Sequence, residues 1–447
     1  MLKKATNLFS LKIILFSLLI IFFSACSKTD PEEFIEEEEG DDEVVEAVEP
    51  VNEADFYIEP SSFAVEKNLV TDYGADIIFS TDDSTILQTA IDDVNSLGGG
   101  KLIIPEGNFT FEDINLKSNV HLRISDQAVI KPMATGTRGY VIFRVTNDTS
   151  STPLENVSII GTGGGKFTVD LRDAQNDKVR VIQSWNVKNF KYSNILVQDK
   201  KSIFAAVEFN GVEIGDKVYG PRFGVVSNID LIDSHYGYGV VQLQLGREIY
   251  FNNLYGKGGI TLRIETHNKT LYDASKYVAP DNLFGRDIRS ENGNCAVMLS
   301  PHFVKIGKAD IGIIKSVGSG YAVRVEKGFV TAKEQQDSNV TLTDGSFSTE
   351  TLIRNVEVTY LDNTAQIKNK DFKFMPCNIR PEQYEYTNEP GFTFDTYIYE
   401  QVASIGGGKN VANYTIDFNP NQITVINSSN SGGRKAFIEE DDTINCN

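Results

Sequence analysis

Cysteine and histidine are scarce in this chain, and their scarcity limits the chemistry that it can perform. Its 447 residues include 4 Cys and 4 His. Neither a Cys-x-x-Cys pair nor a His-Glu-x-x-His run occurs, so we expect no zinc site. Apart from Cys26, three cysteines remain, and we expect Cys377 and Cys446 to form a disulfide if the compartment is oxidising.

A basic surface is also missing. The net charge is −20, and no basic stripe or tail occurs, so we expect no nucleic-acid partner. The negative charge is unevenly spread, because residues 27–60 hold fifteen acidic residues against one Lys. The rest of the chain is therefore only mildly acidic, and its charge says little about a substrate.

The long apolar run near the N-terminus is too short for a comfortable transmembrane helix. A basic segment with Lys3 and Lys4 leads into residues 11–23, which are followed by small residues and Cys26. This order resembles a bacterial lipoprotein signal, in which the Cys becomes the lipidated first residue. We therefore expect residues 1–26 to be a lipoprotein signal peptide; an ordinary secretory cleavage with an incidental Cys is the alternative.

An acidic, Pro-containing segment follows at residues 27–53. Such a charge run buries too little apolar surface to fold, so we expect a disordered tether. Acidic residues directly after a lipidated Cys also resemble the sorting signal of surface lipoproteins in some Gram-negative bacteria. We expect an outer-membrane protein at the cell surface, monomeric, with one folded domain over residues 54–447.

The start of this domain has a recognisable order of elements. Asp82 to Ser84 precede a short helical pattern over residues 85–97, and Gly98 to Gly100 stop it. A strand pattern follows over residues 101–107. This order resembles the N-terminal entry of right-handed parallel β-helix proteins of the pectin-lyase type, where a short helix caps the open end of the coil.

Short β patterns then recur along the chain, often beside an Asn. They are residues 156–161, 189–192, 228–232, 248–251 and 355–358. Recurrence at about 20–50 residues predicts a solenoid, whose coils form a core only by stacking. We therefore predict an all-β fold, a right-handed parallel β-helix. The pattern is less clear from about residue 334 onward, and residues 406–409 look like a loop.

The most informative stretch is residues 258–267. Apolar and polar residues alternate there, so a strand would direct Ile260, Leu262 and Ile264 into the core. On the opposite face we expect a row of polar side chains: Thr261, Arg263, Glu265 and His267. A solvated strand is the ordinary alternative to a functional site.

The neighbouring coils carry further polar residues. Gln242 lies 23 positions before Glu265, about one coil, so we expect it to stack beside Glu265. His302 and Arg324 follow on later strands, although His302 is also explained as a hydrogen-bonded turn residue. A carboxylate with an imidazole suits acid–base catalysis. Residues two apart on a strand are separated by about 6.5–7 Å, close to the roughly 6.5–9.5 Å of inverting glycosidases.

Several blocks resemble the iota-carrageenases, glycoside hydrolase family 82. They occur in order from about residue 54 to 330, whereas the rest matches poorly. They are ADFY at residue 54, LKSNVH at 116, KSIFA at 201, YGYG at 236 leading to Gln242, GGITLRIET at 258, AVM at 296 leading to the PHF at 301, and AVR at 322 followed by the GFV at 328.

The resemblance implies roles for individual residues. It makes Glu265 the acid, Gln242 the holder of the attacking water, and His302 a residue for substrate binding or proton traffic. The base of the family is an Asp two positions after the acid, but His267 occupies that position here. An acidic residue that the family places after G-F-V is replaced by Thr331.

The resemblance also implies ligands. Arg263 and Arg324 would be bidentate partners for sulfate or carboxylate groups, and Tyr238 of the YGYG block would bind substrate. Structural calcium is implied, although no Asp/Asn loop here has a spacing that assigns the site. No cofactor is expected for catalysis.

The resulting hypothesis is endo-acting, inverting hydrolysis of β-1,4 linkages in iota-carrageenan, a sulfated galactan. Glu265 would be the acid and His267 would stand at the base position, because a neutral imidazole accepts a proton from water. Two alternatives remain open. One is another β-helix depolymerase, a lyase or a hydrolase acting on a different anionic glycan; the other is a binding-only surface lipoprotein.

Overall fold

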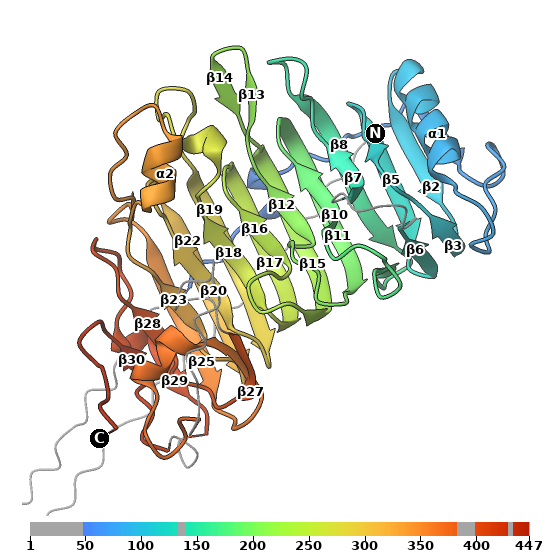
Figure 1. Ribbon diagram of the computed structural model, residues 1–447. Helices are drawn as coiled ribbons and strands as arrows, with labels where there is room; N and C mark the ends of the chain where they lie inside the picture. Colours follow the sequence, from blue (N-terminus) through green and yellow to red (C-terminus); the bar gives the residue numbers. More distant parts are fainter. Residues whose placement is uncertain (1–47, 133–139, 382–397, 428–431, 447) are drawn as a thin grey trace, which may run out of the picture. The chain divides into compact units, whose positions relative to one another are not determined.

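Short strands stack into two long parallel sheets, which form the predicted right-handed parallel β-helix (Figure 1). The computed structural model describes residues 48–132, 140–381, 398–427 and 432–446. The proposed signal peptide, Cys26 and most of the expected tether lie outside these ranges. Each coil adds a strand to each sheet, so residues about one coil apart in the sequence become neighbours in space.

The first sheet is the larger one. Its strands in the described ranges are, in spatial order, β1 (Val65–Asn68), β2 (Gly100–Ile104), β5 (Val120–Ser125), β8 (Leu154–Thr162), β11 (Val187–Gln198), β15 (Arg222–Ser234), β17 (Arg247–Gly258), β19 (Asp281–Glu291), β22 (Ala309–Val317), β25 (Leu352–Thr359) and β29 (Ile423–Val425). Three further strands join its early coils: β3 (Gly107–Thr110), β6 (Ala128–Lys131) and β9 (Phe167–Asp170).

The second sheet carries the candidate site. Its described strands are β4 (Ile114–Asn115), β7 (Tyr140–Val145), β10 (Val179–Ser184), β12 (Val207–Phe209), β16 (Val241–Leu243), β18 (Ile260–Glu265), β20 (Cys295–Ser300), β23 (Val323–Val325), β28 (Gly408–Asn410) and β30 (Phe437–Ile438). Outside the coils lie three small pairs: β13 (Val212–Ile214) with β14 (Lys217–Tyr219), β21 (Lys305–Ile306) with β24 (Ser346–Phe347), and β26 (Ala365–Lys368) with β27 (Ile398–Val402).

Asparagines turn the chain at equivalent places in successive coils. Asn119, Asn156 and Asn189 all have positive φ, between 55° and 63°, a region that Asn tolerates better than most residues. Their side chains hydrogen-bond in a ladder, with Asn156 donating to Asn119 at 2.9 Å and Asn189 to Asn156 at 2.8 Å. The recurring Asn of the sequence therefore marks coil corners.

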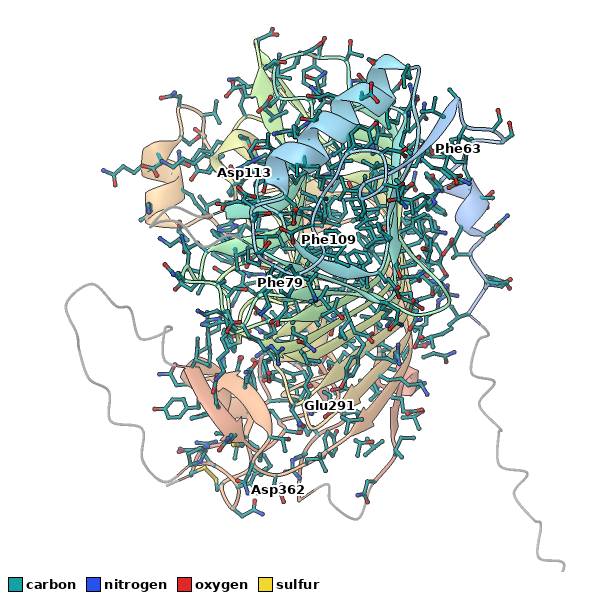
Figure 2. The ribbon with its side chains drawn as sticks, turned by 90° about the vertical axis from the view of Figure 1, so that its right-hand side faces the viewer. Phe63, Phe79, Phe109, Asp113, Glu291 and Asp362 are labelled. Carbon is teal, nitrogen blue, oxygen red and sulfur yellow. A yellow bond between two sulfur atoms is a disulfide. The ribbon has the colours of Figure 1, made fainter. Side chains whose placement is uncertain are left out.

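Helix α1 (Ser84–Ser96) closes the N-terminal end of the coil, as predicted (Figures 1 and 2). Its buried face consists of Leu87, Ala90, Ile91 and Val94. Beneath it Phe109 is fully buried and stacks on Phe111 at 5.7 Å. Each buried side chain of this kind stabilises the fold by roughly 1.5–3 kcal/mol.

The remaining helices are short. They are α2 (Ala332–Asp337) and the 3₁₀ turns η1 (Glu53–Asp55), η2 (Lys269–Leu271), η3 (Asn369–Phe374) and η4 (Pro420–Gln422). No helix in the described ranges has the length and apolar character needed to cross a bilayer.

The segment before Ala54 is packed on the body rather than free. Glu49 accepts a hydrogen bond from Arg286 Nε at 3.2 Å. Lys191 Nζ forms an ion pair with Glu53 Oε2. The folded body therefore includes residues 48–53, which the acidic composition had assigned to the tether.

The C-terminal region continues the coil. Residues 406–409, expected as a loop, enter strand β28, and Lys409 is only 2% exposed. The expected disulfide between Cys377 and Cys446 is present, whereas Cys295 is a buried free thiol.

Candidate active site

A line of mostly polar side chains crosses the outer face of the second sheet. In-register pairing of its strands aligns one residue from each coil. The line is Arg144, Gln183, Glu208, Gln242, Arg263, Met298, Arg324 and Lys409. Most of them are buried, and polar groups are costly to bury without partners, so this face is an ordered polar surface rather than a solvated strand.

The strand at residues 260–265 differs from simple alternation at its start. Leu262 and Ile264 enter the main core, as expected. Ile260 instead packs with Met298 in a separate cluster and lines the groove. Thr261 is fully buried and donates its hydroxyl to Arg289 O at 2.8 Å. Arg263 and Glu265 do share the outer face, as the pattern predicted.

Gln242 does not lie level with Glu265. The register pairs Gln242 with Arg263, because the strands repeat after 21 residues here rather than 23. Continuing this register places Gln244 level with Glu265, and Gln244 lines a cavity of the groove. The predicted direct stacking of Gln242 on Glu265 is therefore wrong by two residues.

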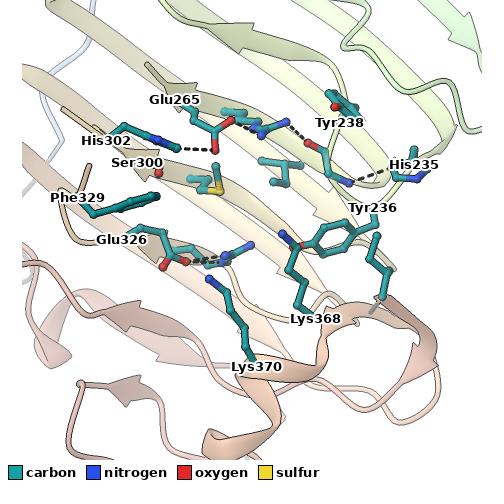
Figure 3. Close-up of a pocket in the computed structure, with 16 residues that line it drawn as sticks. His235, Tyr236, Tyr238, Glu265, Ser300, His302, Glu326, Phe329, Lys368 and Lys370 are labelled. Carbon is teal, nitrogen blue, oxygen red and sulfur yellow. Dashed lines mark hydrogen bonds and ion pairs between the residues drawn. The ribbon is translucent and has the colours of Figure 1, made fainter. Parts of the chain in front are cut away.

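Glu265 lies in the groove between the Arg263 guanidinium and the His302 imidazole (Figure 3). Arg263 donates from Nη2 to Glu265 Oε2 and from Nη1 to Gly237 O. On the other side, His302 Nε2 lies 3.4 Å from Glu265 Oε1. Burial by itself raises the pKa of Glu265, but the Arg263 charge and the His302 hydrogen bond outweigh it and bring the pKa below its ordinary range.

His302 is held rigidly. Its φ is 47°, in the left-handed region that a non-glycine residue rarely adopts. Its carbonyl accepts hydrogen bonds from the backbone N–H groups of Phe329 and Gly345 at 2.8 and 2.6 Å. The imidazole packs on the Phe329 ring, with centroids 4.4 Å apart, and its Nδ1 lies 3.1 Å from Glu334 Oε1. The side chain is thus oriented from both ring nitrogens.

His267 lies at the rim, just past the end of β18. Its ring centroid is 5.1 Å from that of His302, and the residue is exposed to solvent. The partial loss of hydration lowers the pKa of His267, and the nearby Glu265 offsets this only in part. The imidazole is therefore neutral near pH 7, the form that can accept a proton.

Tyr238 and Arg324, the other two predicted binding residues, differ in whether they can reach a ligand. Tyr238 is half-buried on the groove wall, with the Arg263 guanidinium 5.2 Å from its ring centroid. Arg324 is 3% exposed and already bonds Glu326 at 2.6 and 3.0 Å and Asn294. Arg324 therefore organises the groove floor, whereas Tyr238 faces the open space.

Two cavities of about 530 Å³ each meet at His302. One is lined by Arg263, Glu265, Lys368 and Lys370, among others. The second contains His267, Thr331 and Glu334, with Arg180 and Lys333 as cations. Glu265 lines the first cavity, and His302, which bonds it, also lines the second, so the groove extends beyond Glu265.

Sequence reasoning missed Lys368, Lys370 and Glu334. The two lysines come from the region after residue 330, where the family blocks end. Neither has a carboxylate partner among the described residues, which leaves two cations free in a groove. Burial, with the neighbouring charges of Lys370 and Arg324, lowers the pKa of Lys368. The Thr331-x-x-Glu334 spacing is a capping-box signal, but it predicts a helix start and not a site.

The expected calcium site is not assigned. Within the described ranges, no three His, Cys, Asp or Glu side chains gather in a way that could hold a metal ion. Calcium therefore rests on the family resemblance alone.

Known proteins resemble this chain in sequence and in fold. No protein-family model matches the chain. An iota-carrageenase of Alteromonas macleodii is 31% identical over 388 residues, covering 85% of this chain and 76% of that protein. The chain belongs to the iota-carrageenase family. A second iota-carrageenase, of Zobellia galactanivorans, is 40% identical over 279 residues, covering 62% of the chain, which spans 56% of that relative's length.

Solved structures agree with this membership. A family 82 iota-carrageenase from A. fortis superposes with a TM-score of 0.77 at 28% identity, covering 90% of the present chain and 96% of that structure. An iota-carrageenase complexed to iota-carrageenan fragments gives a TM-score of 0.76 at 26% identity, covering 90% and 97%. The β-helix of the chain is therefore that of its family.

Proposed function

We propose that this chain cleaves internal β-1,4 linkages of iota-carrageenan by inverting hydrolysis. The observation that carries the proposal is the placement of Glu265 in a groove of two cavities that share its partner His302, in a member of the iota-carrageenase family. A groove that extends beyond the acid accepts a polymer at internal positions. Free lysines and Arg263 supply positive charge for the sulfate groups of such a substrate.

Glu265 is the general acid in this mechanism. It donates a proton to the glycosidic oxygen as the C–O bond breaks. Arg263 stabilises the ionised form of Glu265, so the protonated form must become more favourable when the substrate is bound. A sulfate group that engages Arg263 would weaken this ion pair and make the protonated acid more favourable. Tyr238 would pack against the sugar beside Arg263, and Gln242 would contact the attacking water.

The test is an assay of the full-length protein on a panel of sulfated galactans. Hydrolysis releases new reducing ends without unsaturated sugars, with the strongest activity on iota-carrageenan. Unsaturated products would mean a lyase, which needs a uronate substrate. A protein that is retained on a carrageenan gel but releases no oligosaccharide would be a binding protein. Either of these two results would overturn the proposal.

His267 is proposed to be the base that accepts a proton from water. His267→Ala is expected to lower kcat by about 10²–10⁴-fold, since no other group takes the proton. His267→Asp is expected to keep or raise the activity, because it supplies the carboxylate that the family uses. Equal rates for the wild type and both variants would show that His267 is not the base.

The pH profile gives a second readout for His267. As pH falls through its pKa, the imidazole becomes charged and can no longer accept a proton, so the rate should fall. Because this pKa is lowered, the acid limb should lie below the usual histidine range near pH 6.5. In His267→Asp the limb should move further down, toward the range of a carboxyl group.

We also propose that the chain is exported as a monomeric lipoprotein attached through Cys26 to the outer membrane at the cell surface. The basic-apolar-Cys order of residues 1–26 supports this, as does the Cys377–Cys446 disulfide, since disulfides persist in oxidising compartments. In cells fed a clickable palmitate analogue, the wild type should carry label and Cys26→Ser should not. A labelled Cys26→Ser variant would contradict the anchor.

A further inference from the structure

A buried carboxylate from outside the expected site reaches His302. Glu334, on α2, is 7% exposed, and its Oε1 lies 3.1 Å from His302 Nδ1. Its other oxygen, Oε2, accepts the backbone N–H of Thr331 at 2.7 Å, and its own N–H donates to Thr331 Oγ1 at 3.1 Å. This capping box fixes the Glu334 side chain in one orientation.

The imidazole of His302 therefore lies between two carboxyl groups, Glu334 at Nδ1 and Glu265 at Nε2. Because Oε2 of Glu334 accepts the Thr331 N–H, Oε1 is the oxygen that faces the imidazole, and a carboxylate oxygen there favours the tautomer with a proton on Nδ1. The state of Nε2 then depends on Glu265. Either an imidazolium donates from Nε2 to the Glu265 carboxylate, or a protonated Glu265 donates to a bare Nε2.

We propose that Glu334 is a positioning residue that keeps a proton on His302 Nδ1, so that Nε2 exchanges one proton with the acid Glu265. This inference rests on the proposed hydrolysis. Glu265 gives its proton to the leaving oxygen, the C–O bond breaks, water attacks the sugar carbon, and His267 takes the water proton. Nε2 of His302, which is then bare, takes a proton from solvent and passes it to Glu265, and His267 releases its proton to solvent.

The position of Glu334 matters because this chain departs from its family nearby. Two positions at which the family resemblance places carboxylates hold His267 and Thr331 here. Among the described residues, the carboxylates bonded to His302 are those of Glu265 and Glu334. Glu334, three residues after Thr331, thus places a carboxyl group beside His302.

Other charges face this unit from each element around it. From β18 and its end come Arg263 and His267, and from the groove walls come Arg324, Glu326, Lys368, Lys370, Arg180, Glu208, Lys269, Lys333 and Asp337. Arg180, Arg324 and Lys269 are paired, with Glu208, Glu326 and Asp337 respectively. None of them bonds His302, so Glu334 is the direct control on Nδ1.

The decisive variant is Glu334→Gln. Glutamine also serves in a capping box, so its oxygen can accept the Thr331 N–H and α2 should be retained. Its amide NH₂ then faces His302 Nδ1 and donates to it. This moves the imidazole proton to Nε2, where it stabilises the ionised, inactive form of Glu265.

We expect Glu334→Gln to lower kcat at least about tenfold, with KM nearly unchanged. The basic limb of the pH profile should move to lower pH, because the shared proton is held less firmly without the Glu334 charge. Glu350→Gln, an exposed glutamate outside the groove, is the matched control and should behave as the wild type. Unchanged kcat and an unmoved basic limb in Glu334→Gln would overturn the proposal.

Nitrogen NMR of the histidine side chains tests the inference without turnover. The chain has four histidines, and His302→Gln identifies the signals of His302. In the wild type, Nδ1 of His302 should carry a proton, whereas Glu334→Gln should shift the neutral ring to the Nε2-protonated tautomer. The same tautomer in both proteins would refute the inference even if carrageenan hydrolysis were confirmed. A wild type without hydrolysis would instead refute the proposed function.

Discussion

Replacing Glu265 by glutamine is expected to lower kcat on iota-carrageenan by about 10²–10⁴-fold, the usual contribution of a general acid. The amide has nearly the same shape but no proton of suitable acidity to give to the leaving oxygen. Reducing-end release measures the loss, and retention on a carrageenan gel measures binding. Binding should persist, because Arg263 and the free lysines Lys368 and Lys370 remain.

The loss is specific to the groove only if a Glu→Gln change outside the groove leaves kcat unchanged. Glu357 lies on β25 of the first sheet, where it pairs with Lys315 at the surface at 3.4 Å. Glu357→Gln should therefore leave kcat unchanged. If Glu265→Gln retained wild-type kcat, Glu265 would not be the acid and the mechanism would need a different proton donor.

Replacing Lys409 by methionine is expected to destabilise the fold by about 3–5 kcal/mol, the usual effect of breaking a buried ion pair. Lys409 Nζ lies 3.0 Å from Asp371 and 2.7 Å from Glu326, and the side chains of Lys409 and Asp371 are each 2% exposed. Methionine fills similar space but leaves Asp371 buried without its cation. The midpoint of urea unfolding at neutral pH measures the change.

Acidification should reduce this penalty. Burial raises the pKa of Asp371, but Lys409 and Arg324 more than offset it, so the pKa of this carboxyl is lowered. Its contribution to stability is thus present above the unfolded pKa near 3.9 and is lost as the pH falls. Without Lys409 the carboxyl is expected to protonate more readily, so the difference between variant and wild type should shrink in acid.

The matched control is Lys435→Met. Lys435 pairs with Asp442 at the surface, and its side chain is 56% exposed. An exposed pair contributes at most about 1 kcal/mol. If both lysine variants lost the same stability, burial of the Lys409 pair would not be the cause.

Local sequence patterns were enough to predict the architecture. The Asp-Asp-Ser start and triple-Gly end bounded α1, and the short β patterns that recur beside Asn predicted a solenoid. The alternation near Glu265 correctly placed Arg263 and Glu265 on one face. These features depend on neighbours in sequence, so they could be inferred without coordinates.

The register of the strands that form the groove could not be inferred from the sequence. Coil length varies with loops and corners, so a spacing of 23 residues suggested that Gln242 meets Glu265, whereas the strands pair it with Arg263. A slip of two residues keeps the same face, and alternation therefore gives no warning of it. Only the pairing of the strands decides which residues meet.

Chain segments distant in sequence decided the rest. Lys409 follows three glycines, a composition typical of a loop, yet its partners Asp371 and Glu326 make it a buried strand residue. Glu334 lies 69 positions after Glu265, and nothing local connects them. The sequence by itself determined the coil, its capping helix and the shared face of Arg263 and Glu265, because each depends on adjacent residues. The tertiary structure alone decided the ion pair that keeps Glu265 charged, the free lysines and the Glu334–His302 contact, because hydrogen bonds and charges act through space between segments that only folding brings together.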